Sequence, residues 1–285
     1  MLKADSPSVS LRSPDEEALR SNVQSEPVDP NLSSDKPSAT MCNRYTIKTS
    51  LSQLAAFYKA DLFGDFPATE IADVEIFPRS IAPGLVQNAD GDRELHPMQF
   101  AFAPPGCPTP SDPKRALNNA RIESVDRWPW KHAIQKNRCV LPLTAFREPA
   151  YWGETEGTEI RFQRPDEGLL HVAGIYRIWK SPDHRTSLHT MSFLMRPAST
   201  YIMDHGHHRQ PLFIAATGID AWINPIDYTI EELKELLRTH AESPELIYHH
   251  ARDMAASWIK RKSAKLKERD KQLTELESLE NDVPF

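Results

Sequence analysis

The sequence lacks the features that mark several common classes of protein. No apolar run approaches the roughly 20 residues needed to cross a bilayer, and the opening stretch MLKADSPSVS has no apolar core of a secretory signal. Only three of the 285 residues are cysteines, and their scattered positions (42, 107 and 139) fit neither a disulfide framework nor a zinc motif. We therefore expect a monomer in a reducing, cytoplasmic setting (the nucleoid in a bacterium, the nucleus in a eukaryote), with no membrane, metal or cofactor.

An excess of positive charge is also missing, because the formal net charge is -6. Residues 1–40 account for half of it, with 4 basic and 7 acidic side chains. Two stretches carry a net positive charge. Residues 111–138 hold 7 basic and 3 acidic side chains, and residues 260–271 hold 7 basic and 2 acidic ones. Binding a phosphate backbone needs only local Lys and Arg density. The overall sign therefore leaves nucleic acid open as a partner, although such runs also occur on ordinary solvated faces.

The chain divides into three parts by composition. Residues 1–41 are rich in Ser and Pro, the first forty contain no aromatic residue, and they predict a disordered extension that is either not translated or removed. Residues 42–250 predict a folded domain, and residues 251–285 a charged helix and tail. In the domain, apolar alternation predicts strands over 44–47, 74–82, 98–102, 138–142, 159–163, 169–179 and 188–196. Ala82-Pro83-Gly84 has the composition of a turn.

Helices are expected mainly at the edges of this domain. Ser50 is a candidate cap for a helix whose Leu51, Leu54, Phe57 and Tyr58 share one face. A second helix is expected around residues 128–132, a capping box opens another at Thr229, and residues 252–279 predict a long polar helix. The pattern indicates an α+β fold, with a mostly antiparallel sheet and a barrel-like core flanked by helices.

Cys42 directly follows Met41, at the point where the folded part begins. If the chain starts at Met41 and that Met is removed, Cys42 carries a free α-amine beside its thiol. Such an aminothiol condenses with an aldehyde to an imine, which the thiol closes to a thiazolidine ring. The α-amine has a pKa of about 7.8 against about 10.4 for Lys, so far more of it is neutral at pH 7. The alternative is that Cys42 is a small buried hydrophobe.

Three further polar residues stand beside apolar segments: Asn119, Glu148 and His207. Each has an ordinary explanation, as a turn residue, a solvated strand end or a surface histidine. Together they suit imine chemistry, because a Glu and a His can act as base and acid while an amide positions the amine. Arg44 and Arg121 are suited to phosphate contacts. His207 and its neighbouring histidines lack a further group at ligand spacing, so we do not expect a metal site.

A set of short motifs resembles the SRAP family, the SOS response-associated peptidase-like proteins that shield abasic sites. Cys42-Asn43-Arg44-Tyr45 resembles the family's Cys-Gly-Arg-Tyr/Phe start. The other motifs follow in the family's order: Ile81-Ala82-Pro83-Gly84, Asn119-Ala120-Arg121-x-Glu123, Arg138-Cys139-x-x-Pro142 with Phe146-x-Glu148, Ala173-Gly174-Ile175-Tyr176, and His207-x-Arg209-x-Pro211. Each is weak alone, but their order over residues 42–250 makes the resemblance specific.

The resemblance implies a thiazolidine crosslink between Cys42 and the aldehyde of an abasic site in single-stranded DNA. Asn119 would position the amine, and Glu148 and His207 would transfer protons. Arg44, Arg121 and Arg209 would contact the DNA. The family's two tryptophans in the 100–106 segment are absent, so any base stacking there would rest on Phe100. The usual Gly is Asn43 here, a residue that also tolerates left-handed backbone.

Whether the first forty residues stay attached determines which function is possible. While Met41 stays attached, Cys42 has no free amine and no thiazolidine can form. We favour translation from Met41, with removal by a protease as the other route to an active protein. Two alternatives remain open: a cysteine peptidase that cuts its own leader with Cys42 and His207, and a single-strand binding module without catalysis.

Overall fold

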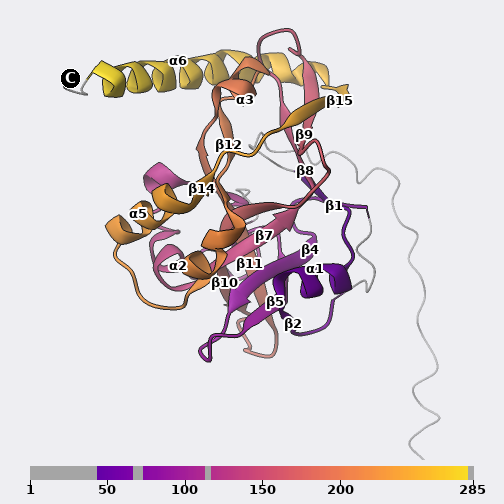
Figure 1. Ribbon diagram of the computed structural model, residues 1–285, viewed down its shortest axis with the longest axis vertical. Coiled ribbons are helices and arrows are strands. Elements are labelled where there is room, and N and C mark those ends of the chain that lie inside the picture. Colours follow the sequence, from indigo (N-terminus) through magenta and orange to yellow (C-terminus); the bar gives the residue numbers. More distant parts are fainter. Residues whose placement is uncertain (1–43, 67–72, 113–116, 282–285) are drawn as a thin grey trace, which may run out of the picture. The chain divides into compact units, whose positions relative to one another are not determined.

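Five strands close into a barrel at the centre of the fold (Figure 1). The computed structural model describes residues 44–66, 73–112 and 117–281. The barrel order is β11–β5–β4–β7–β10 and back to β11. Neighbours are antiparallel except for the parallel pair β5 and β11. The strands are β4 (Ile81–Gln87), β5 (Arg93–Gln99), β7 (Arg138–Leu143), β10 (Leu170–Lys180) and β11 (Ser187–Pro197).

Short strands extend this sheet, and a second sheet packs beside it. The extensions are β2 (Asp61–Leu62), β6 (Asn119–Arg121), β12 (Arg209–Pro211), β13 (Phe213–Ile214) and β14 (Ala241–Glu242). The second sheet has five antiparallel strands in the order β15 (Ile247–Asp253), β9 (Thr158–Gln163), β8 (Ala145–Pro149), β1 (Arg44–Ile47) and β3 (Val74–Ile76). The α+β fold with a barrel-like core is confirmed.

Aromatic rings join the two sheets in one core. Tyr45 from β1 lies edge-on to Phe100, with ring centroids 5.1 Å apart, and both rings contact Phe193 of β11. All three side chains are completely buried. Removing such rings from water supplies much of the driving force for packing. The start of β1 is therefore held firmly against the barrel.

Six α-helices surround the sheets in the described part of the chain. They are α1 (Leu51–Tyr58), α2 (Lys131–Lys136), α3 (Thr200–Asp204), α4 (Ile219–Ile223), α5 (Ile230–His240) and α6 (Ile259–Asn281). Ser50 caps α1 and Thr229 caps α5, each in a capping box, as predicted. Phe57 departs from the predicted buried face of α1, since 54% of it is exposed.

The structure corrects the interpretation of residues 74–102. Ala82, Pro83 and Gly84 do not turn the chain but lie inside β4. A Cβ at Gly84 would lie 2.5 Å from the Met98 sulfur, so the glycine permits close packing between strands. The strand predicted over 98–102 is β5, which begins at Arg93 and ends at Gln99.

Candidate functional site

Glu148 reaches the interior because of its place in β8. Side chains alternate between the faces of a strand, so Phe146 and Glu148 point one way and Arg147 the other. Phe146 is fully buried and Glu148 is 1% exposed, whereas Arg147 is partly exposed. A carboxyl group buried to this degree needs a polar partner to replace its contacts with water. The side chain that supplies it comes from the turn between α3 and β12.

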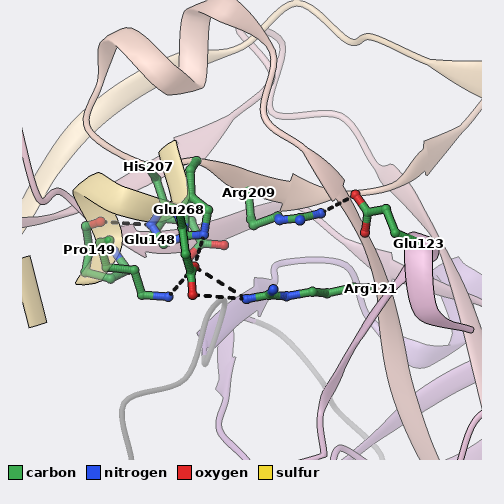
Figure 2. Close-up of polar contacts among 9 residues, drawn as sticks. Arg121, Glu123, Glu148, Pro149, His207, Arg209 and Glu268 are labelled. Atoms are coloured by element: carbon green, nitrogen blue, oxygen red, sulfur yellow. Dashed lines mark hydrogen bonds and ion pairs between the residues drawn. The ribbon is translucent and has the colours of Figure 1, made fainter. Parts of the chain in front are cut away.

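That turn places His207 against the end of β8. Gly206 has φ of +93°, and its carbonyl accepts a hydrogen bond from the Tyr151 backbone N–H at 2.8 Å. His207 is 1% exposed; its Nδ1 lies 2.9 Å from the Pro149 carbonyl oxygen, and its Nε2 lies 3.6 Å from Glu148 Oε2 (Figure 2). The structure thus brings two predicted catalytic side chains together as a buried Glu148–His207 pair.

The hydrogen bond to Pro149 fixes where His207 holds its proton. A carbonyl oxygen only accepts, so Nδ1 donates and Nε2 presents a lone pair toward Glu148. Burial, followed by the neighbouring His208, holds the pKa of His207 well below its usual value. His207 is therefore neutral near pH 7. An imidazole lone pair and a carboxyl group that face each other can share one proton, which is the arrangement of an acid–base pair.

Two predicted DNA-binding arginines lie on the strands that flank β11. Arg121 ends β6, and Arg209 begins β12. Arg121 Nη2 is 3.4 Å from Glu268 of α6, and Arg209 Nη1 is 2.5 Å from Glu123 (Figure 2). Asn119 begins β6, two residues before Arg121 and opposite Phe193. The β6 strand thus carries both the predicted amide and a predicted cation beside the barrel.

Two predicted site residues lie elsewhere. Arg44 stands opposite Arg147 in the β1–β8 ladder, so its side chain lies on the face of the sheet opposite to Glu148. The Arg44 guanidinium is 3.8 Å from Glu159 and 4.9 Å from the Phe77 ring centre. Phe100 is completely buried, which leaves no ring face for a base to stack on. Cys42 and Asn43 lie outside the described residues.

Sequence reasoning missed two residues that complete the site. His208 stacks on His207 with ring centroids 5.1 Å apart, and burial, then Lys265, lowers its pKa to about 3. His208 Nε2 is 2.6 Å from Glu268 Oε2. The only sequence signal for Glu268 is the basic run around it, which says nothing about contacts.

A metal-ligand cluster and a membrane-spanning helix are both absent from the described residues. Among residues 44–66, 73–112 and 117–281, no three His, Cys, Asp or Glu side chains converge as metal ligands would. No helix in those ranges is long and apolar enough to span a bilayer.

The chain is similar to one protein family and to several solved structures. The family model described as SOS response associated peptidase (SRAP) matches residues 41–257. A structure from Bordetella bronchiseptica has a TM-score of 0.59 at 18% identity and covers 74% of this chain and 100% of its own. One from Bacteroides thetaiotaomicron has a TM-score of 0.58 at 18% identity, with coverages of 77% and 94%.

A phage-related protein from B. bronchiseptica is similar in the same way, with a TM-score of 0.55, 18% identity and coverages of 74% and 95%. At these identities the structures support the fold alone. A search of curated protein sequences gives no significant match.

Proposed function

The chain belongs to the SOS response associated peptidase (SRAP) family, which supports a role in the response to DNA damage, and we propose that it crosslinks itself to abasic sites in single-stranded DNA. The product is a thiazolidine between Cys42 and the ring-opened sugar aldehyde. The single observation that carries the proposal is the buried Glu148–His207 pair at the end of β8.

The register of β1 supports a reaction at this pair. The described part of β1 begins at Arg44, directly opposite Arg147, so the strand enters the sheet beside Glu148. Cys42 is two residues earlier in the sequence. Two residues of chain reach at most about 7 Å. The chain length alone therefore keeps position 42 within about 7 Å of Arg44.

The chemistry needs one base and one acid. The α-amine of Cys42 attacks the aldehyde carbon, and the amine proton passes to the Glu148–His207 pair. The alkoxide takes that proton back to form the carbinolamine hydroxyl. A second proton from the pair lets the hydroxyl leave as water, and the iminium nitrogen returns one proton to the pair, which gives an imine. The thiol then adds to the imine carbon, and its proton ends on nitrogen. The net reaction joins aminothiol and aldehyde with loss of one water. The neutral His207 can accept a proton at Nε2 in the first step and return it in the second.

The cations beside the pair suit the DNA backbone. Arg121 and Arg209 come from the two strands that flank β11 and can each hold a phosphate through two parallel hydrogen bonds. Asn119, on the same strand as Arg121, is suited to orient the amine. No base-stacking ring is proposed, because Phe100 is buried. Specificity would then rest on the aldehyde chemistry and on phosphate contacts.

A second candidate function uses the same side chains. The family description includes peptidase activity, and the His207 lone pair could instead deprotonate the Cys42 thiol for attack on a peptide bond. The substrate in that case would be the leader that ends at Met41. Leader cleavage that is lost in Cys42→Ala, without any crosslink to DNA, would favour this candidate.

The test of the acid–base pair is Glu148→Gln in a protein that begins at Cys42. The amide keeps the shape of the side chain but can no longer exchange a proton with His207, so the crosslinking rate should fall roughly 100-fold or more. Glu167→Gln, an exposed site on the β9–β10 loop, is the matched control and should keep the wild-type rate. The rate is followed on denaturing gels, and melting temperatures confirm folding. Equal rates for Glu148→Gln and wild type would refute the assignment.

A further inference from the structure

Helix α6 lies beyond the family match, which ends at residue 257, yet it packs beside the candidate site. Its first turn and the residue before it contact the β8–β9 hairpin: Lys262 Nζ is 2.6 Å from Glu156, and a Cβ at Gly157 would lie 3.2 Å from the ring of Trp258, which directly precedes α6. Further along, the Arg269 guanidinium lies 5.1 Å from the Trp152 ring centre. An element outside the matched range thus lies beside α3, which leads into the turn that carries His207 (Figure 1).

Glu268 is the side chain of α6 that enters the site. Its carboxylate lies 3.4 Å from Arg121 Nη2, 2.6 Å from His208 Nε2 and 3.1 Å from Lys265 Nζ. Figure 2 shows this carboxylate facing the Arg121 guanidinium from the side of the Glu148–His207 pair. An anionic oxygen among an arginine, a lysine and a histidine occupies the setting that a phosphate oxygen would take.

The ion pairs that hold α6 against the domain can be replaced by other ionic contacts. Arg121 and Glu268 keep 39% and 38% of their side-chain surface exposed, and Lys262 and Glu156 keep 32% and 35%. Ion pairs between such half-exposed groups contribute little and weaken further with salt. DNA phosphates, which also bind through salt-sensitive contacts, can therefore compete with Glu268 for Arg121.

Four of the seven basic residues of α6 pair with carboxylates of the protein itself. Lys262 pairs with Glu156, Lys265 with Glu268, and Lys271 with Glu275. Arg269 pairs with Asp270. These cations are engaged with carboxylates of the protein itself, while Glu268 places a negative charge on Arg121. At Arg121, therefore, α6 presents an anion that competes with a phosphate and not a further cation.

We propose that α6 is an intramolecular competitor of single-stranded DNA, in which Glu268 takes the place of a phosphate on Arg121 and must leave before DNA binds. The inference rests on the proposed function for the identity of the ligand. It adds a regulatory element that sets how readily DNA reaches Arg121.

The decisive comparison is Glu268→Gln against Glu275→Gln in the full chain. Both changes remove one negative charge from α6, but Glu275 pairs with Lys271 along the helix. Binding of an undamaged single-stranded oligonucleotide is measured by fluorescence anisotropy. Glu268→Gln should tighten binding about threefold or more, and Glu275→Gln by much less. In the Arg121→Ala background, the gain from Glu268→Gln should disappear, because the competition acts through that arginine.

Hydrogen exchange gives an independent readout on the wild-type protein. If DNA displaces α6, amides in residues 259–275 should exchange faster in the complex than in the free protein. Slower exchange there, weaker binding by Glu268→Gln, or equal effects of the two Gln variants would each overturn the proposal. The use of undamaged DNA separates this test from the crosslink. Binding without later crosslinking refutes the proposed reaction alone, and no binding by either wild type or Glu268→Gln refutes the competition.

Discussion

Buried neutral histidines are the clearest residue-scale feature of this protein. Burial keeps the pKa of His207 well below its usual value, and burial, then Lys265, lowers that of His208 to about 3. Away from the site, burial, then Arg164, lowers the pKa of His171 to about 4. Such groups take up protons in the unfolded chain at a pH where the folded chain does not. They make the stability of the domain depend on pH.

His171 allows this dependence to be tested outside the candidate site. Its Nδ1 contacts the Tyr58 hydroxyl at 2.8 Å. The pKa of this histidine is about 6.5 in the unfolded chain and about 4 in the folded one. Between these two pH values, unfolding is accompanied by the uptake of a proton. Stability contributed at this position is therefore present above pH 6.5 and lost as pH falls toward 4. In His171→Gln, the slope of unfolding free energy against pH should decrease by about 1.4 kcal/mol per unit near pH 5.

Urea unfolding at several pH values from 4.5 to 7.5 measures that slope. Comparison of slopes rather than of absolute stabilities removes the constant cost of the substitution itself. A variant with the same slope as the wild type would show that His171 is protonated in the folded protein as readily as in the unfolded one.

Residue chemistry predicted part of the site. Glu148 and His207 lie 3.6 Å apart in the structure, and their joint catalytic role stays a prediction. The sequence could not tell that Arg44 and Glu148 occupy opposite faces of one sheet, because that depends on the pairing register of β1 and β8. Nor could it tell a buried Phe100 from an exposed stacking ring, since the same residue type serves both purposes.

At the scale of elements, the best predictions came from residues with one strong local role. The capping residues Ser50 and Thr229 located two helices correctly. The turn predicted at Pro83 and Gly84 is wrong, because tertiary packing against Met98 outweighs the usual preference of these residues for turns. The β15 strand, over 247–253, carries a polar run that pairs with β9 at the edge of a sheet and lacks a clear apolar alternation.

The α3–β12 turn is the element that positions His207, and Gly206 is its critical residue. Its φ is +93°, and a Cβ there would lie 2.5 Å from the Trp152 carbonyl oxygen. Gly206→Ala should lower the unfolding free energy by roughly 2 kcal/mol or more, because backbone strain and a clash add. It should also slow crosslinking, because His207 moves with the turn.

Gly91→Ala is the matched control for that substitution. Gly91 has φ of +91°, but nothing lies within 4 Å of the position of its Cβ. This variant should lose only the smaller stability that a positive φ costs. Urea unfolding and crosslinking rates compare the two. Equal losses of stability would mean that the close approach at Gly206 does not constrain the turn.

At the scale of the whole chain, the order of motifs was the most informative part of the sequence. Six short motifs in family order predicted the family and its fold, and the family match over residues 41–257 confirms the family assignment. The docking of α6 could not be predicted, because a charged helix gives no sign of which surface it covers. The division of the chain into 1–41, 42–250 and 251–285 stays a prediction.

The central claim concerns the chemistry of the chain that begins at Cys42, and intact mass tests it most directly. Protein expressed from Met41, with Met41 removed, is incubated with a single-stranded oligonucleotide that carries one abasic site. The account predicts a species heavier by the oligonucleotide minus one water. It should be absent with an undamaged strand, with Cys42→Ala, and with protein that retains residues 1–41. No adduct from protein shown to begin at Cys42, or an equal adduct from Cys42→Ala, would contradict the account.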